Sequence, residues 1–307
     1  MNKAVTYILL GASLWGTIGW FIKNLYVYGF TPMEVVTLRV TTSAIILLLF
    51  LLITSPNKVK LTSLSDIKYF IGTGIFSIIF FNYCMFTAIS LSSIPVATAL
   101  LYTAPAFVAI LSVYLFKESF TKRKSVALFV TLIGTLFTVQ LIPLNVNNLQ
   151  LGSILFGIGS GIGYALYSII SKFALNKYST LSITTFTFVV AAIALIPFFP
   201  YQEKLPLLLD KEVLFYAFGL GLFPTAIAYI VYTYGLNQTE ASKAAILSTI
   251  EPVVAASIGI IIFKETFDML QMLGMTMIIG AVILMQTENK NNAQVIKLRG
   301  RTSGKPS

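Results

Sequence analysis

Long apolar stretches alternate with short polar connections along almost the whole chain. Each stretch is close to the roughly 20 residues that a helix needs to cross a hydrocarbon core of about 30 Å. A membrane β-barrel would instead show segments of about ten residues with alternating hydrophobicity. The pattern therefore predicts an all-α polytopic membrane protein with about ten transmembrane helices. The predicted spans are residues 4–22, 35–53, 69–88, 95–116, 126–142, 152–174, 181–199, 213–234, 241–263 and 270–285.

The composition agrees with a membrane protein and excludes several kinds of chemistry. Hydrophobic residues make up 57% of the 307 residues and charged residues only 10%. A soluble domain carries roughly a quarter charged residues, so membrane lipid is the expected environment of most of this chain. The chain has no histidine and one cysteine, Cys84, which excludes zinc sites and His-based catalytic triads. We predict no metal site, no cofactor and no enzymatic activity.

The second half of the chain resembles the first at an offset of about 147 residues. The segment LFKESF at residues 115–120 matches IFKETF at residues 262–267, and Pro105 falls on Pro252 in the same register. Five helices are an odd number, so the second copy must cross the membrane in the opposite direction, as in the inverted repeats of many secondary transporters. The predicted units are residues 1–147 for the first five-helix repeat, 148–287 for the second, inverted repeat and 288–307 for a basic cytoplasmic tail.

The charges in the loops predict the orientation, because Lys and Arg accumulate on the cytoplasmic side. The loop at residues 121–124 reads TKRK, whereas its counterpart at residues 268–271 reads DMLQ. With the N-terminus inside, about 16 Lys and Arg are cytoplasmic and about four are outside. We expect a multi-pass protein of the cell inner membrane with both termini cytoplasmic. The net charge of +10 follows this topology and gives no indication of a nucleic-acid partner, and the tail is expected to be disordered and to contact anionic lipid.

An ordered set of motifs gives the chain a family resemblance. The motifs are Trp15-Gly16 in the first helix, Pro32 followed by Arg39 in the second, the apolar-Pro-apolar helices four and nine that end in Lys-Glu, and Glu251-Pro252. This set resembles the EamA branch of the drug/metabolite transporter superfamily over residues 3–286. The resemblance implies a carrier or exporter of amino acids and other small metabolites, working without ATP. The two halves are not chemically symmetric, because Ala104 in the first half corresponds to Glu251 in the second.

Two ionisable residues lie inside predicted spans, where a charge costs at least about 2.5–3.5 kcal/mol. Glu251 is a candidate for proton coupling or substrate contact near the middle of the ninth helix. The alternative is a carboxyl group that bonds another helix or stays neutral beside the kink at Pro252. The long side chain of Arg39 could reach the outer surface, contact an anionic substrate group or pair with Glu251.

The remaining candidates are aromatic, amide and helix-end residues. Most Trp and Tyr in membrane proteins lie at the interface, but Trp15, Tyr83 and Tyr102 lie well inside their spans. Together with Asn82 they are candidates for the wall of a substrate cavity, where rings can stack on a cation. Pro105 and Pro252 predict helix kinks. The expected structural anchors at helix ends are Glu118, Glu265, Lys23 and Lys172.

These observations predict a secondary transporter of small metabolites such as amino acids, with alternating access between the repeats and proton coupling as one option. The alternatives are a passive channel and a membrane-embedded enzyme acting on lipid. Such an enzyme would need clustered acids or metal ligands, whereas the three Asp and eight Glu of this chain are scattered. The expected partners are membrane lipid and a small-molecule substrate. The direction of transport and a homodimer are left open.

Overall fold

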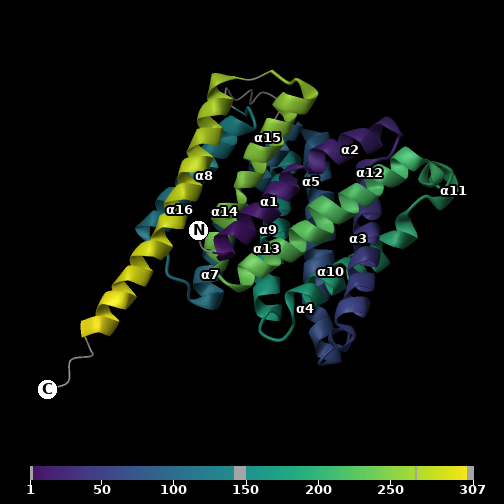
Figure 1. The fold of residues 1–307 in the computed structure, drawn as a ribbon. Helices are drawn as coiled ribbons and strands as arrows, with labels where there is room; N and C mark the ends of the chain where they lie inside the picture. Colours follow the sequence, from purple (N-terminus) through teal and green to yellow (C-terminus); the bar gives the residue numbers. More distant parts are fainter. Residues whose placement is uncertain (1–2, 142–149, 267, 303–307) are drawn as a thin grey trace.

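The computed structural model describes residues 3–141, 150–266 and 268–302 (Figure 1). Every regular element in these ranges is helical. Nine helical stretches in this described part are long and apolar enough to cross a membrane. The remaining predicted span forms α8 (Lys122–Thr138), whose 17 residues give a length of about 26 Å, enough for a short crossing. The predicted all-α polytopic fold of about ten transmembrane helices is confirmed.

Several membrane passes are divided into shorter helices, and the division recurs in the two halves. The first half contains α1 (Lys3–Gly16) with α2 (Ile18–Val27), α3 (Pro32–Thr54), α4 (Ile67–Ile71) with the π-helical η3 (Gly72–Ile79) and α5 (Phe80–Leu91), α6 (Ile94–Leu101) with α7 (Ala104–Phe116), and α8. The second half contains α9 (Leu151–Ala174), α10 (Thr180–Leu195), α12 (Lys211–Gly221) with the π-helical η7 (Leu222–Ile227) and α13 (Ala228–Asn237), α14 (Ala241–Ser248) with α15 (Ile250–Phe263), and α16 (Met269–Thr302). One-turn helices lie in the loops at η1 (Pro56–Lys58), η2 (Leu64–Asp66), η5 (Ile196–Phe198), α11 (Tyr201–Lys204) and η6 (Leu207–Leu209).

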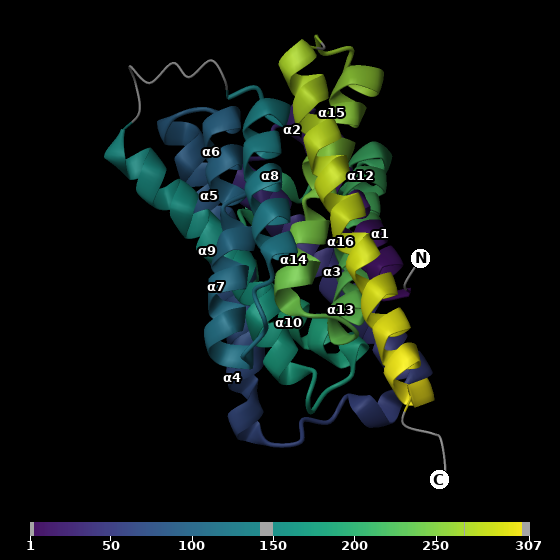
Figure 2. The ribbon, with the colours of Figure 1, turned by 90° about the vertical axis from the view of Figure 1, so that its left-hand side faces the viewer.

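The two halves interlock, because each main helix pair takes one helix from each half. α1 packs along α13, and in the equivalent position α9 packs along α5. α3 packs along α10, and α8 lies along α16 at one side of the molecule (Figure 2). The largest buried cluster therefore draws its side chains from both halves. This arrangement places the centre of the molecule at the junction of the two repeats.

Buried hydroxyl groups also join the two halves. Ser43 Oγ donates to the carbonyl oxygen of Gly221 at 2.6 Å, and the hydroxyl oxygens of Thr73 and Thr187 lie 2.6 Å apart. Each such hydrogen bond inside a membrane protein contributes about 0.6 kcal/mol. Because apolar side chains gain little by leaving lipid, these polar contacts help to fix which helices pair.

α3 has a capped start, and α16 extends beyond the last predicted span. α3 begins with a capping box, in which Thr31 Oγ1 accepts from Glu34 N and Glu34 Oε2 accepts from Thr31 N at 2.9 Å. α16 continues to Thr302, so the prediction of a disordered tail is wrong for residues 288–302. The predicted boundary between the repeats, at residues 147 and 148, and the last tail residues, 303–307, lie outside the described residues.

Candidate functional site

Two interrupted helices meet near the centre of the molecule. The break between α1 and α2 falls at Thr17, whose Oγ1 donates to the carbonyl oxygen of Leu14 at 2.7 Å. The break between α14 and α15 falls at Thr249, whose Oγ1 donates to the carbonyl oxygen of Ile246 at 2.6 Å. Each of these carbonyl groups also accepts the backbone N–H of the same threonine, so the hydroxyl adds a second hydrogen bond at the break. The breaks bring Trp15 and Glu251, which flank them, towards the same region.

Glu251 lies in the first turn of α15, where the partial positive charge of the helix N-terminus favours a carboxylate. Tyr164 on α9 donates its hydroxyl to Glu251 Oε2 at 3.1 Å. Tyr102, at the end of α6, interacts with the same carboxyl group. Helices from both repeats therefore place hydrogen-bond donors around one partly buried acid.

A cluster of aromatic rings packs around Trp15. The ring centroid of Trp15 lies 5.8 Å from that of Tyr164, 5.0 Å from that of Tyr229 and 4.7 Å from that of Tyr232. Tyr167 packs edge-on against Tyr229 at 4.8 Å. Such edge-to-face pairs are favourable by about 0.5–1.5 kcal/mol each, beyond their area of contact. The rings make one rigid wall between α1, α9 and α13.

Two tyrosines of this wall are held by hydroxyl partners. The Tyr167 hydroxyl lies 2.7 Å from Thr233 Oγ1, and the Tyr232 hydroxyl lies 2.8 Å from Ser168 Oγ. These bonds fix the ring orientation without involving Glu251. They link α9 to α13, which run beside each other in the second half.

Arg39 on α3 faces the same region and is only 3% exposed. Its guanidinium interacts with Tyr229 and with the charge of Glu251. Among the described residues no ion pair within 4.0 Å joins Arg39 to Glu251. The interpretation that Arg39 reaches the outer surface is wrong, because its side chain is buried. Arg39 and Glu251 instead place opposite charges at the aromatic cluster without a direct contact.

Two hydrogen-bond donors of the cluster have no partner in the protein. They are Nε1 of Trp15 and Nε of Arg39, both buried. A buried donor without a partner costs about 1–3 kcal/mol, so such groups are rare in native proteins. Their occurrence together, beside Glu251, is the pattern expected where a polar ligand group is to be bound.

The cavity beside this cluster is small in the present conformation. It is lined by Trp15, Ser77, Phe81, Tyr164, Tyr167, Ser168 and Tyr229, and its volume is about 10 Å³. That volume corresponds to about one water molecule. A metabolite therefore enters only if the surrounding helices move apart.

The EamA-like transporter family model matches residues 2–140 and 151–287, one match for each half of the chain. The chain belongs to the EamA-like transporter family. The family resemblance expected from the sequence motifs is thereby confirmed, and so is the classification as a membrane transporter. The two matches coincide with the two sets of five passes seen in the structure.

Relatives and a solved structure support the same assignment. The chain is 31% identical to an uncharacterized transporter of Archaeoglobus fulgidus over 287 residues, which cover 92% of this chain and 96% of the relative. It is 26% identical to the uncharacterized transporter YetK of Bacillus subtilis, covering 82% of this chain and 78% of that protein. A crystal structure with 15% sequence identity superposes with a TM-score of 0.76 over 92% of this chain and 96% of the other, and it shows the shared fold alone.

Four of the six predicted cavity residues of this EamA-family chain come together in the structure. Glu251, Arg39, Trp15 and Tyr102 all lie at the central cluster. Tyr83 is instead 53% exposed and lines a separate groove of about 710 Å³ between α3, η3 and the end of α10. Asn82, the remaining predicted cavity residue, is buried and donates to the carbonyl oxygen of Ile78 in its own pass at 2.7 Å.

The two prolines predicted as kinks lie just after complete helix breaks. Pro105 is in the first turn of α7, after the break at Thr103, and Pro252 is in the first turn of α15, after the break at Thr249. Passes four and nine are therefore each built from two half-helices. Discontinuous helices of this kind commonly form the substrate sites of secondary transporters.

The tyrosines of α9 and α13 belong to the cluster but are not among the site residues that the sequence predicts. Tyr164 and Tyr167 are three residues apart, as are Tyr229 and Tyr232. Residues three apart lie on one face of a helix, so the repeated spacing indicates two aromatic faces. An interfacial position is the default for membrane tyrosines, and only the structure distinguishes that default from a buried wall.

Proposed function

We propose that this EamA-family protein is a secondary transporter of small zwitterionic metabolites such as amino acids, working by alternating access between its inverted repeats. The observation that carries the proposal is the separation of Arg39 and Glu251 at one buried aromatic cluster. Two opposite charges that are close but not paired match a ligand that itself carries both charges. The cluster lies at the junction of the repeats, where inverted-repeat transporters bind their substrates.

The geometry suggests how such a ligand is held. A ligand carboxylate would accept from the two unpartnered donors, Arg39 Nε and Trp15 Nε1. A ligand ammonium group would lie against Glu251 and the faces of the neighbouring rings, which attract cations. In the ligand-free protein, Glu251 could carry a proton in place of the ammonium group, which would couple transport to protons.

In the proposed orientation the protein spans the cell membrane with both termini in the cytoplasm. The charge bias of the loops supports it, because the loop that carries residues 121–124 lies on the same side as the start of α1 and the end of α9. Lys172 at the end of α9 donates to the carbonyl oxygen of Leu236 near the end of α13, and Glu118, just before that loop, accepts from the backbone N–H of Ala241 at the start of α14.

The proposal is tested by counterflow in proteoliposomes that contain the full chain. Vesicles preloaded with a pool of unlabelled amino acids should accumulate at least one labelled amino acid, and a pH gradient should change the extent if protons are coupled. Glu251→Gln and Arg39→Gln should each abolish accumulation, while Glu203→Gln on the surface should leave it unchanged. Each variant would be checked for a monodisperse elution profile.

Three outcomes would overturn the proposal. Uptake that never exceeds equilibration, at the same rate with and without internal substrate, would indicate a passive channel. A modified lipid in the same vesicles would indicate an enzyme. Counterflow that survives Glu251→Gln and Arg39→Gln would place the substrate elsewhere, and the groove beside Tyr83 would then be the site to examine.

A further inference from the structure

One face of α9 carries a row of hydroxyl groups that starts beside Glu251. The hydroxyl row consists of Tyr164, Tyr167, Ser168 and Ser171, whose spacing of three or four residues places them on one face of the helix. Tyr167, Ser168 and Ser171 are buried. From Tyr164 to Ser171 the helix rises by about 10 Å, since each residue adds about 1.5 Å. The row therefore runs from Glu251 almost to the end of α9.

The first link joins the row to the carboxyl group. Tyr164 donates its hydroxyl to Glu251 Oε2 at 3.1 Å. The cavity of about 10 Å³ is lined by Tyr164, Tyr167 and Ser168, among other residues, and has room for about one water molecule. Several of its lining residues carry hydroxyl groups, and a buried water typically has about three polar partners. Such a water would connect the Tyr164 hydroxyl to the rest of the row.

The next hydroxyl groups are joined by hydrogen bonds within the protein. Ser168 Oγ lies 2.8 Å from the Tyr232 hydroxyl, and the Tyr167 hydroxyl lies 2.7 Å from Thr233 Oγ1. Tyr167 also interacts with the side chain of Ser171, one turn further along α9. A hydroxyl group can donate its own proton while its oxygen accepts another. The row and its partners on α13 are therefore groups through which a proton can pass.

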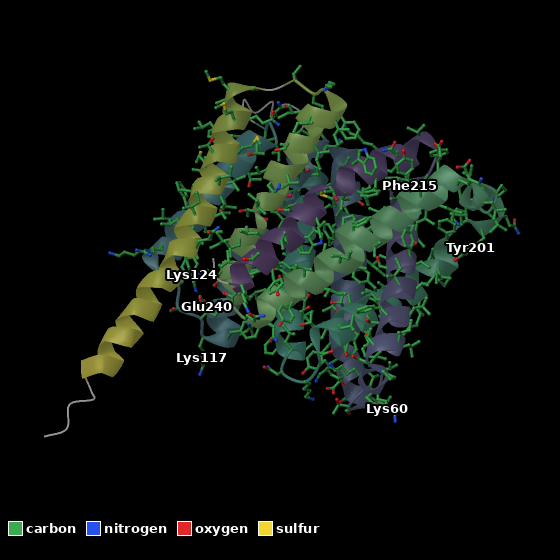
Figure 3. All side chains as sticks on the ribbon, viewed as in Figure 1. Lys60, Lys117, Lys124, Tyr201, Phe215 and Glu240 are labelled. Atoms are coloured by element: carbon green, nitrogen blue, oxygen red, sulfur yellow. The ribbon has the colours of Figure 1, made fainter. Side chains whose placement is uncertain are left out.

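The far end of the row lies beside an open cleft. Ser171 Oγ is buried and has no hydrogen-bond partner at ordinary distance in the described part of the chain, and the same holds for Ser112 Oγ on the neighbouring α7. Buried hydroxyl groups without a protein partner are usually satisfied by water. Lys172, next to Ser171, and Phe116, one turn after Ser112, line a cleft of about 640 Å³ on the side where Figure 3 labels Lys117. The cleft thus brings bulk water close to the end of the row.

The equivalent helix of the first repeat, α1, carries no such row. With Lys23 aligned on Lys172, the four positions of the row are occupied in α1 by Trp15, Ile18, Gly19 and Ile22. None of these four residues has a hydroxyl group. Helix packing alone does not explain the difference, because α1 packs along α13 as α9 packs along α5. Along these two helices, hydroxyl groups lead from Glu251 to one face of the molecule and not to the other.

We propose that the hydroxyl row is a proton path between Glu251 and the cleft at Lys172, which is cytoplasmic in the proposed orientation. A proton from water in the cleft enters at Ser171, and each hydroxyl oxygen accepts one proton while passing its own to the next group. Tyr164 gives its hydroxyl proton to Glu251 Oε2 and receives one from the water in the cavity. Every hydroxyl then holds one proton as before, and the carboxylate has gained one. The reverse transfer returns the proton to the cleft.

The path deepens the proposed function and rests on it, because it supplies the proton that takes the place of the ligand ammonium group. The titratable and charged side chains that face Glu251 are Tyr102, Tyr164, Arg39, Tyr229 and Tyr232. Of these, Tyr164 is the one from which the row continues along α9. A cavity for one water passes protons but no metabolite, so Glu251 exchanges protons with one face while the route for the metabolite is closed.

The test follows the protonation of Glu251 itself, by infrared spectroscopy of the full chain in lipid nanodiscs after a drop in pH. The carbonyl band of a protonated carboxyl group that is missing in Glu251→Gln belongs to Glu251. Tyr167→Phe keeps the ring and removes one hydroxyl of the row. It should slow the appearance of the band at least about tenfold, since a positioned proton-transfer group commonly contributes about 100-fold or more.

Two variants at the end of the row separate the hydroxyl from its space. Ser171→Val and Ser171→Thr have nearly the same shape, and only the threonine keeps a hydroxyl. The valine should slow protonation as Tyr167→Phe does, whereas the threonine should keep the rate of the unaltered chain. Ser160→Ala is the matched control, because Ser160 is a buried serine of α9 whose hydroxyl donates to Gly157 in its own helix, on the other side of Tyr164. It should leave the rate unchanged.

Four outcomes would decide the matter. Equal rates in the unaltered chain, Tyr167→Phe and Ser171→Val would overturn the path and leave the hydroxyl groups as contacts between helices. Equal slowing by Ser171→Val and Ser171→Thr would also overturn it, because shape and not the hydroxyl would set the rate. A rate that depends on the Ser171 hydroxyl, without any counterflow, would retain the path and overturn the proposed transport. Counterflow with a protonation rate that ignores Tyr167 would do the reverse.

Discussion

At the scale of single residues, Gly16 allows the first pass to touch the turn that carries Glu251. A Cβ atom at Gly16 would lie 2.8 Å from the carbonyl oxygen of Glu251 and 2.7 Å from Cβ of Val254. Both partners belong to a helix and cannot move away alone. The position of the Glu251 carboxyl group thus depends on the absence of a side chain at Gly16 in the first pass.

The substitution Gly16→Ala should therefore destabilise the protein by about 1–3 kcal/mol, the usual cost of an extra methyl group in a packed interior. It should also reduce counterflow, because α15 and Glu251 must shift. The matched control is Gly19→Ala, three residues later, where a Cβ atom would meet no atom within 4 Å. Thermal unfolding in detergent measures the first effect. An unchanged unfolding temperature for Gly16→Ala would show that α1 and α15 separate at no cost.

The individual site residues also show which parts of the site could be predicted from the sequence. Glu251 and Arg39 could be selected from the sequence because charge inside a membrane span is expensive, whatever the fold. Trp15 and Tyr102 could be selected by their depth in a span. Tyr83 has a similar depth, but its side chain is exposed and lies away from the cluster. Its selection failed because depth does not specify which face of a helix is buried. That information comes only from how the helices pack.

At the scale of elements, a polar bridge ties the loop before α4 to the turn after α9. Asp66 Oδ1 lies 2.9 Å from Nζ of Lys177, and Tyr178 donates its hydroxyl to Asp66 Oδ2 at 2.9 Å. The backbone N–H of Thr62 in turn donates to the Tyr178 hydroxyl. The hydrogen bond to Asp66 raises the pKa of Lys177 above its ordinary value. The loop and the turn are therefore joined by an ion pair and two hydrogen bonds.

The pH dependence of this bridge follows from the sign of that shift. Because the pKa of Lys177 is raised on folding, its stabilising effect is complete below the ordinary lysine pKa of about 10.4 and is lost as the pH rises through the raised value. A spin label at Lys60→Cys, on the exposed loop in Figure 3, should stay ordered from about pH 7 to about pH 10 and become mobile above. Asp66→Asn should make the label mobile throughout, whereas Asp268→Asn at the opposite face should not. A label that becomes mobile near neutral pH would contradict the bridge.

The helix breaks give a further prediction. Pro252 cannot donate a backbone hydrogen bond, which favours the interruption at Thr249. Pro252→Ala should allow α14 and α15 to join and should turn Glu251 relative to Tyr164, lowering counterflow at least tenfold with little loss of folded protein. Pro105→Ala makes the same change in the first half, where Ala104 stands in place of the acid, and its effect should be smaller. Equal loss in both variants would show that the break matters for folding and not for the position of Glu251.

Elements were predictable to different degrees. Apolar length located the passes, and the prolines indicated the interruptions in passes four and nine. The interruption at Thr17 and the π-helical segment η3 contain no proline, whereas the π-helical segment η7 contains Pro224, which the sequence prediction did not use. They arise where one pass adjusts its backbone to fit its neighbours, so they depend on the packing of the whole bundle. α8 was predicted as a span although its helix has only 17 residues.

At the scale of the whole molecule, the inverted repeat accounts for the fold, whereas its two faces differ in sequence. Glu118 and Glu265, the residues after the equivalent ends of α7 and α15, mark opposite faces of the molecule, the Glu118 face and the Glu265 face. All eight residues of α14 are buried, whereas three of the eight residues of its counterpart α6 are buried. The repeat was readable from the Lys-Glu step and the matched prolines, and the same comparison shows where the faces differ, with Gln271 at the position of Lys124 and Pro95 at that of Ser242.

The charges of the loops predict the orientation of the whole molecule in the membrane. Lys122, Arg123 and Lys124 follow the Glu118 corner, whereas the chain after Glu265 carries Asp268 and no lysine or arginine up to residue 288. A basic loop resists transfer across the cell membrane, so the Glu118 face should be cytoplasmic and both termini should lie on it. Alkaline phosphatase, which needs disulfides that form only outside the cytoplasm, should be inactive when fused after Gln286 and active when fused after Phe263. Replacing residues 121–124 with DMLQ, which removes the basic loop upstream of the second fusion, should lower the activity of that fusion. High activity after Gln286 in the unaltered chain would show that the protein is inserted the other way, and the Glu265 face would then be cytoplasmic.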